Sequence, residues 1–346
     1  MRYANVTDFG LWYDFRNPPG SPASMASVYA ETIEQAAYAE QLGFDHIWTT
    51  EHHFVDDGYS PSLLPICAAL ASKTARARIG TALLLLLLHD PIRIAEDAAT
   101  VDLLSGGRFD LGIGIGYREP EFAAFGVHKR TRGHQFEEAI AVVRQALASG
   151  PIDFHGQFYD YEGIDVSPKP VQQPLPIWLG GLTARAARRA ARLGDGFLAG
   201  AGEDFVPEFL AERTSLGQPP TPVWSSIGFV GVAYDPEAML ARIAPHVVYQ
   251  RRIYATWLQQ AGTTIWEVPE SVDDLRRSDP DLVVTPDRAR HIIAERLAAQ
   301  PAITHLSWAP IPPGLAPRDA VASLELFAAE VLPHFRNAAE PAGYGI

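Results

Sequence analysis

Short apolar segments alternate with amphipathic segments along nearly the whole chain. Near His134–Ala148, apolar residues recur at spacings of three and four, as on one face of a helix. The apolar segments are nearly continuous instead, which is typical of parallel strands covered on both sides. The predicted strands are Phe9–Tyr13, Phe44–Thr50, Arg78–Leu88, Arg108–Gly116, Pro176–Gly181, Gly196–Gly200, Val223–Ala233 and Ile303–Ala309.

A predicted helix follows each predicted strand. The helices are expected near Met25–Leu42, Ser62–Lys73, Ile92–Leu104, His134–Ala148, Thr183–Leu193, after Glu203, from Pro236, and near Ala320–Phe335. Strict alternation of strand and helix predicts an α/β fold in which residues 1–346 form a single (β/α)8 TIM barrel domain. A doubly wound open sheet is the alternative, because alternation alone does not determine whether the sheet closes.

Two segments exceed what a minimal barrel needs. Residues 151–174 are rich in proline, glycine and aromatic residues and predict an irregular excursion with a small hairpin after helix 4. Residues 250–281 are polar and aromatic and predict an insertion after helix 7. Long insertions on the carboxyl side of barrel strands commonly form lids over the site.

Composition excludes several classes of protein. The formal net charge of −13 argues against binding to nucleic acid, which needs basic patches. Cys67 is the single cysteine, so there is no intramolecular disulfide, and its apolar setting predicts a buried helix residue. The apolar run Ala82–Leu88 is too short to span a membrane, and the first residues do not resemble a signal peptide. We therefore expect a cytoplasmic protein.

The stretch WTTEHHF places Glu51, His52 and His53 directly after a predicted strand. Adjacent side chains of an extended chain point to opposite faces, so His52 and His53 are poorly placed to bind one metal ion, and we predict no metal site. At the carboxyl mouth of a barrel, an imidazole can act as an acid, a base or a hydrogen-bond donor. The structural alternative is a corner histidine bonded to the backbone. His89, after the third strand, could face the same mouth.

Glycines recur at every second position of Gly112–Gly116. In a strand these glycines share one face, which leaves room for a ligand close to the backbone, for tight packing against bulky neighbours, or for both at different heights of the barrel. The spacing is not the dinucleotide-binding fingerprint, which needs a turn into a helix.

A second glycine pair, Gly180 and Gly181, lies between a predicted strand and a helix that Thr183 could cap. Free backbone N–H groups at such a helix start can bind an anion, and Arg185 could add a charge-assisted hydrogen bond. The later arginines of this helix are expected on its solvated face; these are Arg188, Arg189 and Arg192.

Five stretches in this order resemble the luciferase-like flavin-dependent monooxygenase family. They are GFDHIWTTEHHF, IGTALLLLLLHDP, AEDAATVDLLSGGRFDLGIGIGY with EFAAFGV, PIWLGG, and LELFAAEVLPHFR. The resemblance covers most of the chain apart from residues 250–281 and implies the same barrel fold.

The resemblance also implies a function. Reduced FMN would bind at the carboxyl mouth and react with O2 to give a flavin C4a-peroxide, which oxygenates a small organic substrate. A separate NAD(P)H:flavin reductase would supply the reduced FMN, and the family often forms dimers, so a homodimer or higher homo-oligomer is expected. One branch instead uses the deazaflavin F420 for hydride transfer, and a flavin-binding barrel without catalysis is a third possibility.

Family positions can be carried over to this chain one by one. His52 matches the catalytic histidine at the end of the second strand. Ala82 and Leu83 match a pair joined by a cis peptide bond under the flavin ring, and Gly114 and Tyr117 match positions that line the flavin. The phosphate-binding positions implied are Arg132, Gly181, Leu182 and Thr183.

Two positions depart from the luciferases, which carry an arginine and a glutamate where this chain has Ile115 and Leu182. The phosphate would therefore be bound by backbone groups, Thr183 and Arg185. Light emission is not implied. The aromatic residues expected around an apolar mouth are Tyr13, Phe15, Tyr59, Trp257, Trp266 and Trp308. They do not identify the substrate.

Overall fold

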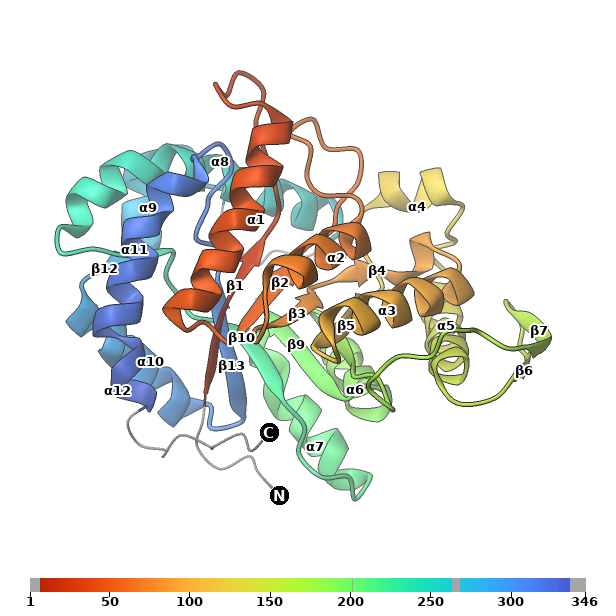
Figure 1. Ribbon diagram of the computed structural model, residues 1–346. Coiled ribbons are helices and arrows are strands. Elements are labelled where there is room, and N and C mark those ends of the chain that lie inside the picture. Colours follow the sequence, from red (N-terminus) through yellow and green to blue (C-terminus); the bar gives the residue numbers. More distant parts are fainter. Residues whose placement is uncertain (1–6, 201, 263–267, 337–346) are drawn as a thin grey trace.

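A computed structural model describes residues 7–200, 202–262 and 268–336, and in them a parallel sheet closes into a barrel (Figure 1). The hydrogen-bonded order is β3-β2-β1-β13-β10-β9-β8-β5, and a further pairing of β3 with β5 completes the ring. The closed barrel is confirmed and the open sheet is excluded. The strands are β1 (Asp8–Tyr13), β2 (His46–Thr49), β3 (Arg78–Thr81) continued by β4 (Leu84–Leu85), β5 (Phe109–Gly114), β8 (Ile177–Gly180), β9 (Gly196–Gly200), β10 (Val223–Ser226) and β13 (Ile303–Trp308).

Helices between the strands surround the barrel (Figure 1). They are α1 (Met25–Leu42), α2 (Leu63–Lys73), α3 (Pro91–Ser105), α5 (Arg132–Leu147), α6 (Ala184–Leu193), α7 (Val206–Ser215), α10 (Pro286–Ala299) and α11 (Pro317–Glu330). The last predicted helix is divided at Val331, because α11 ends there and a short α12 (Leu332–Arg336) follows.

Large indoles fill part of the barrel interior. Trp48, Trp178 and Trp224 form one buried cluster, with the Trp48 and Trp178 ring centroids 5.6 Å apart in a T-shaped contact. Gly80 and Gly196 make room for them, since a Cβ atom at either glycine would lie 2.2–2.3 Å from an indole carbon. Glycine on one strand therefore lets the neighbouring strand carry a side chain too large for an ordinary barrel layer.

The third strand is interrupted rather than continuous to Leu88 as predicted. The peptide bond between Ala82 and Leu83 is cis, as the resemblance implies. Beyond it, β4 pairs with β5 for two residues, and Leu86–Leu88 form a 3-10 turn, η1. The run Ala82–Leu88 therefore contains a cis peptide bond, a short strand and a 3-10 turn. A nearly uniform run of leucines does not indicate these changes of conformation.

The first excursion contains the expected hairpin, in which β6 (Ile152–His155) and β7 (Asp160–Ile164) pair antiparallel. A short helix that was not predicted, α4 (Glu119–Phe125), lies between β5 and α5. A second 3-10 turn, η2 (Glu203–Phe205), leads into α7.

The second excursion differs in extent from the prediction. The insertion was predicted to start at Gln250, but helix α8 (Pro236–Gln260) continues ten residues beyond that position. Its apolar face continues through Ala255 and Leu258. The predicted seventh strand ends at Ser226, and residues 231–232 (β11) pair with β12 (Val283–Val284) outside the barrel. Helix α9 (Val272–Ser278) completes the excursion, which stands between β10 and α10 on the carboxyl side of the strand.

Cys67 is fully buried in α2, as predicted, and burial raises the pKa of its thiol to about 12. In the described part of the chain, no helix is long and apolar enough to cross a membrane.

A buried carboxylate joins α1 to the start of β3. Glu40 accepts hydrogen bonds from the backbone amides of Ala75 and Ala77, at 2.9 and 2.7 Å, and from the amide of Arg76 between them. Burial raises the pKa of Glu40, but these backbone hydrogen bonds outweigh it and leave the pKa below its ordinary value.

We predict that Glu40→Gln lowers the free energy of unfolding by about 2 kcal/mol at pH 7, since a charged acceptor is lost to several amides. Because the folded-state pKa of Glu40 is lowered, its contribution is present above the unfolded pKa near 4.5 and is lost as the pH falls through the folded pKa. Urea unfolding at pH 7 and pH 4 measures both effects. Glu34→Gln, at an exposed position of α1, is the control; an equal loss there would contradict the prediction.

Candidate active site

The carboxyl ends of parallel barrel strands meet at one mouth, and the predicted site residues follow three of them. His52 follows β2, Tyr117 follows β5, and Gly181 follows β8. In an extended segment, side chains alternate in direction, so Glu51 and His53 turn one way and His52 turns the other.

His52 is 6% exposed and lies between an acid and a phenol. Its Nδ1 is 2.9 Å from Oε1 of Glu121, and its Nε2 is 3.1 Å from the hydroxyl of Tyr117. Burial lowers the pKa of His52 below that of an ordinary imidazole, although Glu121 acts in the opposite direction. A carboxylate only accepts hydrogen bonds, so Nδ1 carries the proton and Nε2 presents a lone pair toward Tyr117.

Glu121 of α4 hydrogen-bonds to several groups around His52. Its Oε1 also accepts from the backbone amide of His53 at 3.0 Å and from Arg118 at 2.9 Å. Burial raises the pKa of Glu121, but the hydrogen bonds from His52 and the His53 amide, together with Arg118, leave it below its ordinary value. Sequence reasoning missed Glu121, because α4 is only seven residues long; the signal was an acidic first turn directly after the glycine-rich strand.

Helix α8 covers His52 from the solvent side. Its Trp257 ring lies 4.8 Å from the His52 ring and 4.1 Å from the guanidinium of Arg118. One turn earlier, the hydroxyl of Tyr254 lies 2.6 Å from that of Tyr59, which itself packs 4.9 Å from His52. The second excursion thus supplies a lid over the mouth.

A buried charged cluster that sequence reasoning missed lies under the same helix. Arg16 bonds to Asp57 at 2.7 Å through Nε and lies 3.9 Å from Asp14 through Nη1. Tyr249 of α8 donates to Asp57 at 3.0 Å. Burial raises the pKa of Asp14 to about 6, although Arg16 opposes it. Helix α8 is therefore held over the mouth by a hydrogen bond as well as by aromatic contacts.

The glycine-rich strand and the cis peptide meet inside the mouth. A Cβ atom at Gly114 would lie 2.6 Å from the Leu83 side chain, and one at Gly180 would lie 2.7 Å from it. A Cβ atom at Gly112 would collide with the carbonyl oxygen of Thr81. Protein atoms therefore occupy the space beside these glycines, which favours the tight-packing interpretation. Ala82 and Leu83 are half-buried.

The predicted phosphate loop begins α6. Thr183 caps the helix by accepting from the amide of Ala186 at 3.2 Å, as predicted. Gly181 is required by close packing, because a Cβ atom there would lie 2.2 Å from the Cβ atom of Ala186. Leu182 is half-buried, and Arg185 is exposed. The loop thus presents backbone groups and one exposed cation.

The arginines near this loop differ in burial and in hydrogen bonding. Nη1 of Arg132, the first residue of α5, is buried and has no hydrogen-bond partner in the described structure. Burial lowers the pKa of Arg132, although Glu119 opposes this. Arg189, expected to be solvated, is instead 6% exposed, because its side chain lies over the Phe136 ring of α5 and bonds to Glu137 of the same helix at 2.9 Å.

Only part of the expected aromatic lining faces the mouth. Tyr59 and Trp257 contact His52, whereas Tyr13, Phe15 and Trp308 are buried in the core between barrel and helices. Trp266 lies outside the described residues.

Glu51 and His53 point away from His52 toward the third strand. Oε1 of Glu51 lies 2.8 Å from Nε2 of His53 and 3.2 Å from Nε2 of His89, and its Oε2 accepts from the amide of Leu85. This contact ties the end of β2 to the segment that follows the cis peptide.

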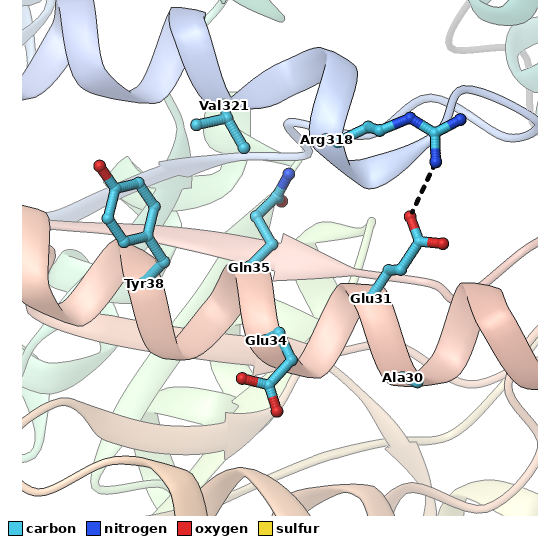
Figure 2. Close-up of a pocket in the computed structure, with 7 residues that line it drawn as sticks. All are labelled: Ala30, Glu31, Glu34, Gln35, Tyr38, Arg318 and Val321. Carbon is cyan, nitrogen blue, oxygen red and sulfur yellow. Dashed lines mark ion pairs between the residues drawn. The ribbon is translucent and has the colours of Figure 1, made fainter.

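An open hollow of about 360 Å³ lies elsewhere, on the outer surface between α1 and α11 (Figure 2). Glu31 and Arg318, 3.7 Å apart, stand at its edge, and Gln35 and Tyr38 line it. It is separate from the barrel mouth.

Comparisons with known proteins agree with this geometry. The family model described as luciferase-like monooxygenase matches residues 7–277. The oxygenase component of flavin-dependent trigonelline monooxygenase from Acinetobacter baylyi is 33% identical over 155 residues, 44% of this chain and 43% of that protein. The F420-dependent glucose-6-phosphate dehydrogenase of Amycolatopsis mediterranei is 31% identical over 180 residues, 50% of this chain and 54% of that protein.

The chain spans about half the length of the curated relatives it matches. Over the whole fold, the crystal structure of a monooxygenase from Streptomyces bottropensis superposes with a TM-score of 0.84, covering 95% of this chain and 100% of that one at 24% identity. The family model covers most of the chain, and the closed barrel agrees with it, so this protein belongs to the luciferase-like monooxygenase family.

Proposed function

We propose that this protein is a flavin-dependent monooxygenase that uses reduced FMN and O2 to oxygenate a small organic substrate. The observation that carries the proposal is the buried, unpartnered Nη1 of Arg132. Helices of a (β/α)8 barrel begin on the side where the strands end, so Arg132 lies on the same side of the barrel as His52. A buried guanidinium nitrogen without a partner is costly, and a phosphate group would complete its hydrogen bonding.

The donor set fits a phosphate. The first amides of α6 are not bonded within the helix, and the helix dipole favours an anion there. Arg132 and Arg185 would add charge, while Leu182 offers no bond of its own. Ala82, Leu83 and Tyr117 would lie against the flavin ring, and Gly114 would contribute indirectly by making room for the Leu83 side chain.

His52 would hold or move a proton at Nε2. Glu121 fixes the imidazole with its proton on Nδ1, so Nε2 is free to accept a proton from a reacting group through or in place of Tyr117. Trp257 and Tyr254 of α8 would exclude water from this corner. Reduced FMN would supply the two electrons that activate O2.

A separate reductase would supply the reduced FMN, as the name of the trigonelline relative, an oxygenase component, suggests. The second candidate function is F420-dependent hydride transfer, which the F420-dependent relatives favour. F420 also carries a phosphate, but its acidic tail suits this chain of net charge −13 less well.

The cofactor assignment is tested by anaerobic titration of the purified protein with reduced FMN and with F420, followed by mixing with O2. We expect reduced FMN to bind and its reoxidation to proceed in two kinetic phases. In His52→Ala, FMN affinity should stay within about tenfold, while the slower phase should change by about a hundredfold. Binding of F420 without binding of FMN would overturn the proposal. If bound reduced FMN were reoxidised at the same rate as free reduced FMN, the protein would be a flavin-binding barrel without oxygenase activity, which would also overturn the proposal.

The phosphate site is tested by Arg132→Met, which keeps the apolar stem and removes the charge. We expect the affinity for FMN to fall roughly tenfold to a hundredfold, since hydrogen bonds to charged groups contribute about 1.5–3 kcal/mol. The affinity for riboflavin, which lacks the phosphate, should not change. Fluorescence quenching measures both affinities. Arg188→Met, on the exposed face of α6, is the control; an equal loss for both flavins would contradict the assignment.

The positioning role of Glu121 is tested by Glu121→Gln. We expect the pKa of His52 to fall further, because the carboxylate that favours the imidazolium form is removed. The Nδ1-protonated tautomer should also cease to be the single form. Histidine-selective ¹⁵N NMR measures both, with His52→Gln to assign the signal. Unchanged His52 resonances would refute this role, and Glu119→Gln on the same helix is the matched control.

A further inference from the structure

The structure brings three metal-ligating side chains together on the face opposite His52. One potential ligand atom from each of Glu51, His53 and His89 lies within 4.8 Å of the other two. The first two come from the segment after β2, and His89 directly follows η1. The adjacent pair His52 and His53 does diverge, as the sequence predicts, but alternation also places Glu51 and His53 on one face, where His89 meets them.

We propose that Glu51, His53 and His89 bind a divalent transition-metal ion of the zinc class. Two imidazoles and one carboxylate form a donor set that suits Zn²⁺, and a water would complete a four-coordinate site. This site does not depend on which cofactor occupies the mouth.

The distances suit such an ion. Ligand atoms about 2.1 Å from a tetrahedral Zn²⁺ stand roughly 3.4 Å apart. Oε1 of Glu51 lies 2.8 Å from the His53 nitrogen and 3.2 Å from the His89 nitrogen. Binding would move Oε1 of Glu51 slightly away from both nitrogens, and the ligand atoms of the two imidazoles, which lie within 4.8 Å of each other, would come to the same spacing by side-chain rotation. Each imidazole would place its proton on Nδ1 and present Nε2 to the ion.

The surroundings favour binding over a hydrogen-bonded brace alone. Both imidazoles converge on one oxygen of Glu51, while the amide of Leu85 holds the other, so Oε1 is oriented as a single-atom ligand. Such outer hydrogen bonds orient metal ligands in known sites. The Glu51 side chain is 1% exposed, whereas that of His89 is 28% exposed, which gives an ion and its water a route from solvent.

A bound ion would join two segments that carry the proposed chemistry. One is the turn after β2, which holds His52, and the other follows the Ala82–Leu83 peptide. The ion would stiffen the mouth without touching the reacting groups.

The test uses the tag-free full chain, stripped with EDTA and dialysed. Zn²⁺ affinity and stoichiometry are measured by competition with a chromophoric chelator, and Co²⁺ absorption reports the coordination geometry. We expect one Zn²⁺ per chain, a tetrahedral Co²⁺ spectrum, and a rise in Tm with Zn²⁺. His89→Ala should lower Zn²⁺ affinity by about a hundredfold or more and abolish the Tm rise.

His155→Ala is the matched control, because His155 and Asp160 form an exposed pair 2.6 Å apart that could bind an ion adventitiously. It should leave Zn²⁺ binding unchanged. Circular dichroism verifies folding, and His89→Gln replaces His89→Ala if the alanine variant unfolds. The proposal is overturned if the wild type binds no Zn²⁺, if a folded His89 variant binds within tenfold of wild type, or if His155→Ala causes the same loss.

Discussion

Closure of the parallel sheet is the constraint on which the rest of this molecule depends. Hydrogen bonds run unbroken from β3 around the ring to β5, and β3 and β5 then pair with each other. Closure holds although the third strand is interrupted, because Gly80 pairs with β5 before the cis peptide and Leu84 pairs with it afterwards. Residues as distant in sequence as His52 and Tyr117 can therefore share a hydrogen bond at one rim.

The same closure explains why glycine and tryptophan occur together. The interior of a small barrel has a fixed width, so an indole on one strand requires a missing side chain on the next. Gly80 and Gly196 meet this requirement for Trp48 and Trp178. Gly114 of β5 and Gly180 of β8 do the same for Leu83, so the packing of Leu83 explains both glycines. This steric demand positions the backbone at the mouth without any contribution from a cofactor.

The sequence predicted the barrel well because each strand and helix has its own local hydrophobic pattern. Closure of the sheet arranges these elements without changing them. The start of α6 was also predictable, since Thr183 caps it with its own side chain. The hydrophobic pattern did not predict the break after Thr81, because a run of leucines is compatible with a strand, a 3-10 turn or a buried core segment. Only the family resemblance implied the cis peptide bond there.

The site was predictable only in part, for a different reason. His52 was predicted from its position after a strand, and Tyr117 was implied by the family resemblance. Glu121 and Tyr254 lie on helices outside the minimal barrel, and their partners are 69 and 195 residues away in sequence. No local pattern encodes such contacts, and Arg189 was misplaced because its burial depends on a neighbouring helix.

The solitary thiol of Cys67 has a practical consequence. It is fully buried, and burial suppresses its ionised, reactive form. The native surface of the described chain therefore offers nothing to maleimide or nitroxide reagents. A cysteine introduced on the solvent face of α8 would be the sole site for thiol labelling, and a spin or fluorescent probe there would measure the mobility of this helix without background.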